Sequence, residues 1–149
     1  MGKQRKRKEL IITKPGVYDA TGYGIVRVIL QNERVELPAR RNGCTQKFTI
    51  EGHSFFITTG EYEDGKLGEI FLEYPKQGSL LRGFMHCFAM SISISLQHNV
   101  PLNVLYKSFK GYTFPPYGKA HGAEDLGIDD VRAVVDCVFQ YLQKQYPNQ

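Results

Sequence analysis

The most reactive side chains in this sequence of 149 residues are those of three cysteines and four histidines. The cysteines, Cys44, Cys87 and Cys137, are far apart, and no Cys-x-x-Cys or His-x-x-x-His pair occurs. His86 and Cys87 are neighbours on a predicted helix, so their side chains diverge by about 100° and cannot chelate one ion together. We therefore expect no metal-binding, cofactor-binding or catalytic residues. We also expect the cysteines to be free or buried thiols, as is typical of proteins in the reducing cytoplasm.

Two polar segments are candidates for contacting a partner molecule. One is a basic turn with paired arginines, and the other is an acidic segment that contains Asp-Gly, a favoured hairpin turn. Because such a hairpin is held by two strands, it could present charge to a partner, but it could equally well only fix the strand register. The candidate residues are Arg40, Arg41, Glu61, Tyr62, Glu63, Asp64 and Gly65.

The charge of the chain is concentrated near its start. The formal net charge is +4, and five basic residues occupy the six positions 3–8, so the remainder is about neutral. We expect residues 1–23 to form a basic arm with a lead-in loop, which is either solvated or in contact with the phosphates of a polynucleotide. No apolar segment approaches the roughly 20 residues of a membrane-spanning helix, and no apolar segment typical of a secretory signal follows the arm.

Residues 24–149 are expected to form a single α+β domain. Segments 25–30, 45–51, 53–59 and 69–73 have the β-branched content or the two-residue alternation of strands. Gly52 and the Asp64-Gly65 pair supply tight turns between the last three strands, which predicts an antiparallel β-meander.

Helices are expected after Pro75. A helix over 79–98, capped by Ser79, would carry an apolar stripe and lie centrally, although 91–95 also alternates as a strand would. A short helix follows Pro101, residues 110–127 are expected to form a loop, and Asp129 would cap a last helix. The fold prediction is thus an antiparallel meander packed on one face by two to three helices. The stripe residues are Leu81, Phe84, Met85, Phe88, Ile92 and Leu96 in the long helix and Val131, Val134, Val135, Val138 and Leu142 in the last.

Two stretches resemble a known family. The first comprises RRNGCTQK at 40–47, Gly52-His53 and TTGEYEDGKLGEIF at 58–71, and the second comprises residues 88–93 and 96–102. Together they resemble the C-terminal (TSCPD) domain of adenosylcobalamin-dependent, class II ribonucleoside-diphosphate reductases, over residues 35–145. Cys44 stands where the family pattern has tyrosine, and the Thr-Ser-Cys-Pro-Asp string is absent.

The resemblance implies a standalone accessory or regulatory domain in deoxyribonucleotide synthesis. The catalytic barrel, the radical-bearing cysteine and the adenosylcobalamin site of the parent enzyme are not expected in this chain, so we expect no cofactor bound here. The implied partner is a class II reductase catalytic chain, and a homo-oligomer is also compatible. The alternative is a nucleic-acid- or nucleotide-binding module that uses the basic arm with Arg40 and Arg41, and a small enzyme using Cys44 or a His–Cys pair ranks last.

Overall fold

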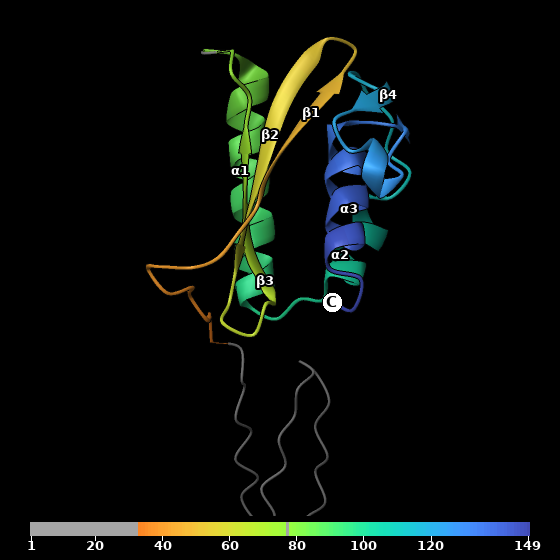
Figure 1. Cartoon of the computed structure of the whole chain (residues 1–149). Helices are drawn as coiled ribbons and strands as arrows, with labels where there is room; N and C mark the ends of the chain where they lie inside the picture. The colour runs from red at the N-terminus through yellow and green to blue at the C-terminus, as the bar shows by residue number, and fades with distance from the viewer. Residues whose placement is uncertain (1–32, 77) are drawn as a thin grey trace, which may run out of the picture. The chain divides into compact units, whose positions relative to one another are not determined.

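The computed structural model describes residues 33–76 and 78–149 (Figure 1). The predicted arm and lead-in loop (1–23), the predicted strand 25–30 and the boundary at residue 24 lie outside these residues.

The predicted meander is confirmed. Its strands are β1 (Thr45–Ile50), β2 (His53–Glu61) and β3 (Leu67–Glu73), each antiparallel to the next. The β1–β2 turn places Glu51 and Gly52 at φ of 47° and 78°, the two positive values that match a hairpin turn to the twist of its strands. Alternate side chains point into the core, and those of Phe48, Ile50, Phe55 and Ile57 are at most 1% exposed.

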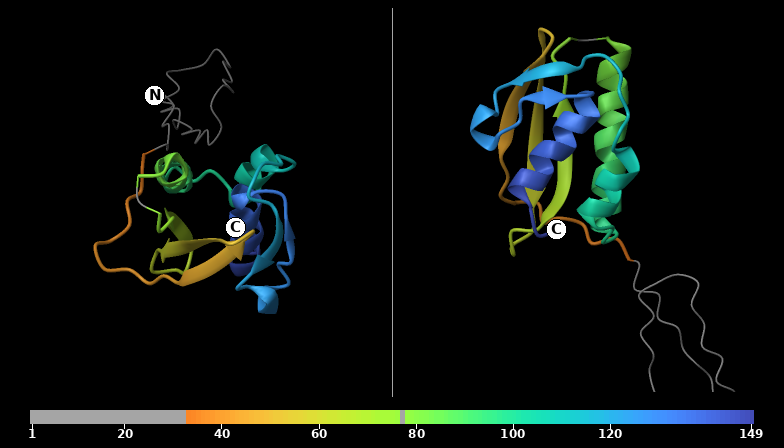
Figure 2. Two further views of the ribbon diagram at one scale, coloured as in Figure 1. Left: turned by 90° about the horizontal axis from the view of Figure 1, so that it is seen from above. Right: turned by 90° about the vertical axis from the view of Figure 1, so that its right-hand side faces the viewer.

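The sheet is larger than the meander, so the prediction of a loop throughout 110–127 is wrong. β4 (Gly118–His121) pairs with β1, and β5 (Asp130–Val131) pairs with β4, which gives the order β3-β2-β1-β4-β5. A short 3₁₀ helix, η1 (Glu124–Leu126), joins the two added strands. The sheet curls, with α1 (Leu80–Gln97) beside β3 and α3 (Val134–Gln145) toward the other end (Figure 2).

The long helix is confirmed, but not its central position. Ser79 caps α1 as predicted, because its Oγ accepts a hydrogen bond from the Arg82 N–H at 3.2 Å. Among residues 33–76 and 78–149, the sheet and the other helices cover only one face of α1, and Phe84 of the predicted stripe is 66% exposed. The buried positions are Met85, Ala89, Ile92, Ser93, Leu96 and Gln97.

The last helix begins later than predicted. α3 starts at Val134, and Val131 belongs to β5. Asp129 does not cap it, since its C=O accepts the Ala120 N–H and its carboxylate lies 3.7 Å from Lys119 Nζ. The pairing of β5 with β4 therefore takes the residues that the helix would have used.

Aromatic rings join the three helices on one side of the core. Phe88 of α1 lies edge-on to Phe109 of α2 (Leu102–Phe109) at 5.4 Å and to Phe139 of α3 at 6.2 Å. Phe109 and Phe139 stack at 5.5 Å. Edge-to-face and stacked rings add to the energy of burial, so this cluster fixes the helices to one another. None of the helices in the described residues is long and apolar enough to cross a membrane.

Candidate interaction surface

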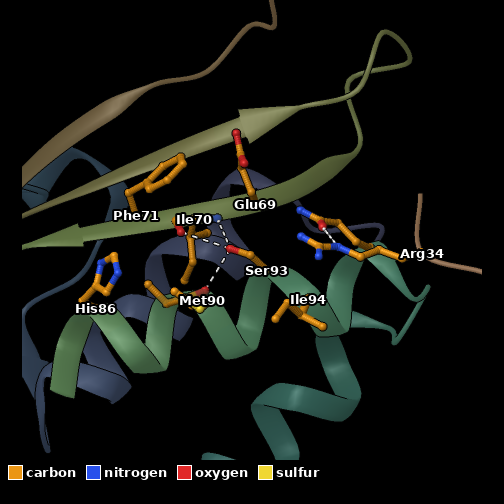
Figure 3. Close-up of a pocket in the computed structure, with 10 residues that line it drawn as sticks. Arg34, Glu69, Ile70, Phe71, His86, Met90, Ser93 and Ile94 are labelled. Carbon is orange, nitrogen blue, oxygen red and sulfur yellow. Dashed lines mark hydrogen bonds between the residues drawn. The ribbon is translucent and has the colours of Figure 1, made fainter. Parts of the chain in front are cut away.

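Helix α1 closes the outer edge of the sheet along β3. The Ile70 N–H donates to Ser93 Oγ at 2.9 Å, and the same hydroxyl lies 3.1 Å from the Ile70 carbonyl oxygen (Figure 3). Gln97 Nε2 donates to the Gly68 carbonyl at 3.2 Å. An unpaired strand edge is a template for pairing with another chain, so these bonds remove part of that template. They also explain why Ser93 and Gln97 are buried although they are polar.

A pocket of about 170 Å³ lies between β3 and α1. Ile70, Ala89 and Met90 contribute apolar lining, and Arg34 lies at one end, where its Nε donates to Gln97 Oε1 at 2.7 Å (Figure 3). A cavity of ~150 Å³ holds a molecule the size of benzene. The pocket is therefore suited to one apolar side chain of a partner.

Arg41 is fixed by an ion pair with Glu69. Arg41 Nε contacts Glu69 Oε1, and the Arg41 guanidinium also donates to the Pro38 and Ala39 carbonyls at 3.3 Å. Glu69 is only 9% exposed. A side chain at Gly60 would collide with that of Glu69, so the glycine leaves the room that the buried carboxylate needs. The pair holds loop 38–43 over the outer face of the sheet.

A groove of about 500 Å³ lies beneath this loop. It is lined by Arg40, by Phe71, which is 43% exposed, and by Thr45 and Thr58, whose hydroxyls lie 2.8 Å apart. No ion pair or hydrogen bond engages the Arg40 side chain within residues 33–76 and 78–149. Among the described residues, Arg40 is thus an unpaired cation that lines this groove.

The predicted acidic hairpin separates into residues with structural contacts and residues without. The Tyr62 hydroxyl donates to the Val35 carbonyl, and Asp64 Oδ1 accepts the Lys66 N–H at 3.0 Å, which with Gly65 at φ 81° shapes the turn. Burial raises the pKa of Tyr62, and the negative charge of Glu69 adds to the shift. Glu63 is exposed and, within the described part of the chain, its side chain makes no such contact.

The structure therefore brings some of the predicted site residues together and not others. Arg40 and Arg41 lie on one groove, while Glu61 turns toward α3, where its carboxylate accepts the Tyr146 hydroxyl at 2.6 Å. Tyr62, Asp64 and Gly65 take part in the contacts and the backbone conformation of this hairpin. Of the charged candidate residues, Arg40 and Glu63 make no side-chain contact with any residue that the structure describes.

Sequence reasoning missed a polar cluster where Glu61 meets the last helix. Burial, and then the hydrogen bond to Glu61, raises the pKa of Tyr146 to about 12. Tyr141 is fully buried, its pKa is raised by burial and then by the nearby Cys44 thiol, and its hydroxyl has no hydrogen-bond partner among the described residues. A tyrosine at a stripe position of a buried helix is the signal that could have indicated this cluster, because its hydroxyl needs a polar neighbour.

The three cysteines are free thiols in different surroundings. Cys44 and Cys87 are exposed, whereas Cys137 is buried, which raises its pKa to about 12. A thiol with so high a pKa is inert at neutral pH. In the described ranges, no group of three or more His, Cys, Asp or Glu side chains is arranged to hold a metal ion.

Comparison with known proteins gives one family. The family model described as the TSCPD domain matches residues 28–146. The vitamin B12-dependent ribonucleotide reductase of Bradyrhizobium diazoefficiens is 39% identical over 122 residues, 82% of this chain and 10% of that enzyme. The enzyme of the same name from Agrobacterium fabrum is 40% identical over 117 residues, 78% of this chain and 9% of its own length. The chain thus spans about a tenth of the length of these relatives, and no solved structure matches it.

Proposed function

Because this chain belongs to the TSCPD domain family, we propose that it is an accessory module that docks on the catalytic chain of a vitamin B12-dependent ribonucleotide reductase. The observation that carries the proposal is that the similarity covers most of this chain but only about a tenth of each enzyme. In those relatives the matching region is covalently joined to the rest of the reductase. We expect a domain of the same family to make the same contact.

The charged side chains that no other described residue contacts are the best candidates for this contact. Arg40 lies at the groove beneath loop 38–43, and Glu63 lies at the tip of the β2–β3 hairpin. The Arg41–Glu69 pair and the Tyr62 hydrogen bond hold these two segments in place. A prepositioned surface loses less entropy on binding, which favours a specific contact.

We expect no adenosylcobalamin to bind the described residues. The hollows along β3 have volumes of about 170 to 500 Å³, which is the size for a side chain or a small molecule and not for a corrin ring that carries a nucleotide. Radical reduction also needs a dithiol, and the three cysteines are free, with one of them buried. We expect no deoxyribonucleotide when the purified chain is supplied with adenosylcobalamin, a dithiol and each ribonucleotide in turn.

The docking proposal is tested by titrating the purified chain against a reductase catalytic chain that lacks its own TSCPD region. Arg40→Glu and Glu63→Lys should each weaken binding by about tenfold, equivalent to roughly 1.4 kcal/mol. Arg132→Glu and Asp125→Lys are matched controls, since both residues are exposed and lie near β5 and β4, at the opposite edge of the sheet from β3. Binding that all four variants reduce equally, or no binding of the unaltered chain, would contradict the proposal.

A second candidate is binding of single-stranded nucleic acid, which the Arg40 groove favours. It combines an unengaged cation with the exposed ring of Phe71, and nucleic-acid surfaces typically pair cations with stacking aromatics. Against it, the carboxylate of Glu69 lies in the same groove. Fluorescence anisotropy with a labelled single-stranded oligonucleotide at ~50 mM salt tests this candidate, and no measurable binding would rule it out. If the arm contacts phosphates, deleting residues 1–9 should reduce the slope of log K against log salt concentration by about 0.7 per lost contact.

A further inference from the structure

One face of α1 is apolar although nothing in the described part of the chain covers it. Its residues, which we call the outer α1 face, are separated by four, three, three and four positions, so they lie on one side of the helix. Leu80 is 78% exposed, Phe84 66%, Met90 51% and Ile94 38%, and Cys87 is also exposed. Contiguous apolar surface of this kind is uncommon on a monomer and marks an interaction site.

The polar groups on this face are satisfied within the helix. Ser91 Oγ donates to the Cys87 carbonyl at 2.9 Å, and Ser95 Oγ donates to the Ser91 carbonyl at 2.8 Å. Both hydroxyls already have a partner, so covering them would leave no hydrogen-bond donor unpaired. Residues 84–90 include no Lys, Arg, Asp or Glu, and the exposed His86 lies on the side of the helix that faces the pocket beside β3. The face can therefore be buried without a large desolvation cost.

The outer α1 face is complementary to itself. Leu80, Cys87 and Ile94 are seven residues apart, the spacing of a two-helix seam. A two-fold axis at Cys87 in an antiparallel pair places Leu80 opposite Ile94 of the other copy and Phe84 opposite Met90. The same operation places Gly83 opposite Ser91, and small residues there allow the two helices to approach closely.

We propose that the outer α1 face is the interface of a homodimer, with α1 of a second copy of this chain as its occupant. An antiparallel pair also opposes the two helix dipoles favourably, and no like charges meet across the seam. A lipid surface fits less well, because membrane-lying helices carry several lysines or arginines beside the apolar face, and α1 has only Arg82. One helix pair is a small interface, so we expect dissociation in the micromolar range.

Sedimentation of the full chain between ~1 and ~200 µM measures this equilibrium. We expect the mass to rise from monomer to dimer, and Phe84→Glu to keep the chain monomeric throughout. Val104→Glu is the matched control: Val104 is 47% exposed and belongs to α2 rather than to the outer α1 face, so its replacement should leave the dimer intact. Circular dichroism of each variant verifies that α1 is still folded.

The antiparallel register has its own test. Phe84→Glu combined with Met90→Lys should restore the dimer, because each glutamate then faces a lysine of the other copy. Cross-linking uses a Cys44→Ser variant, so that Cys87 is its one exposed thiol. A short bismaleimide should join two copies of this variant through Cys87, and adding Cys87→Ser should abolish the covalent dimer. Three results would overturn the proposal. The chain could be monomeric at all concentrations, Phe84→Glu could leave the dimer unchanged, or the double variant could stay monomeric. A monomer whose Phe84→Glu variant loses only reductase binding would assign the face to the reductase instead.

Discussion

Helices α1 and α3 have similar apolar spacing but use it differently. α3 buries one stripe, which includes Val138, Phe139 and Leu142, and its exposed positions include Lys144 and Gln145. α1 buries one apolar face and exposes a second, from Leu80 to Ile94. Within the described residues, α3 therefore has the apolar residues that its own domain buries, whereas α1 has more. That surplus supports our proposal that the outer α1 face contacts a second copy of the chain.

The largest expected effect separates a buried ring from an exposed one. Phe139→Ala should lower the free energy of unfolding by about 3–5 kcal/mol, because the ring is 1% exposed and joins α1, α2 and α3. Phe84→Ala should cost under about 0.5 kcal/mol when the chain is monomeric. Urea unfolding at low protein concentration measures the free energy of unfolding of both variants. Similar losses for the two variants would show that α1 does not expose a second face.

Two serines of α1 give a smaller contrast. Ser93→Ala leaves the Ile70 N–H and C=O without their partner at the edge of β3, which should cost about 1–3 kcal/mol. Ser91→Ala removes a hydroxyl that bonds only to its own helix, so its effect should be close to zero or slightly stabilising. The comparison fails if thermal unfolding ranks the two variants equally.

The smallest effect concerns the contact of α3 with β2. The pKa of Tyr146 is about 12 in the folded chain and about 10 when unfolded, so the folded state holds its proton more tightly. Stability should be unaffected by this group below about pH 10 and should fall as the pH rises from about 10 to about 12. Tyr146→Phe should make that decline shallower in denaturant titrations at a series of pH values. An unchanged slope would mean that burial and the hydrogen bond to Glu61 do not raise the pKa of Tyr146 in the folded chain.

The sequence predicts local features of this fold better than distant pairings. The alternation of 45–51 and 53–59 and the turns at Gly52 and Gly65 are local, and they predict the meander correctly. β4 and β5 are only four and two residues long, and β4 pairs with the distant strand β1, as Ala120 does with Ile50. No local pattern contains the pairing of β1 with β4. β5 then pairs with β4 across η1, and that second pairing is why Asp129 does not cap α3.

The sequence identifies the charged residues of the candidate surface but not the residues with which they interact. Arg40, Arg41 and the acidic hairpin are identifiable as charges, yet only the structure joins Arg41 to Glu69 and Glu61 to Tyr146. Apolar spacing on α1 likewise does not tell which of its two apolar faces the domain buries. That choice depends on the position of β3, whose edge groups require Ser93 and Gln97 on the inner face.

Competition tests whether this domain binds at the site that the relatives' own TSCPD region occupies. The purified chain is titrated against two forms of one vitamin B12-dependent reductase, the intact enzyme and the enzyme without its TSCPD region. We predict at least about tenfold tighter binding to the shortened form, because the intact enzyme already fills the docking site with its own domain. Equal affinity for both forms, or binding to neither, would contradict the account.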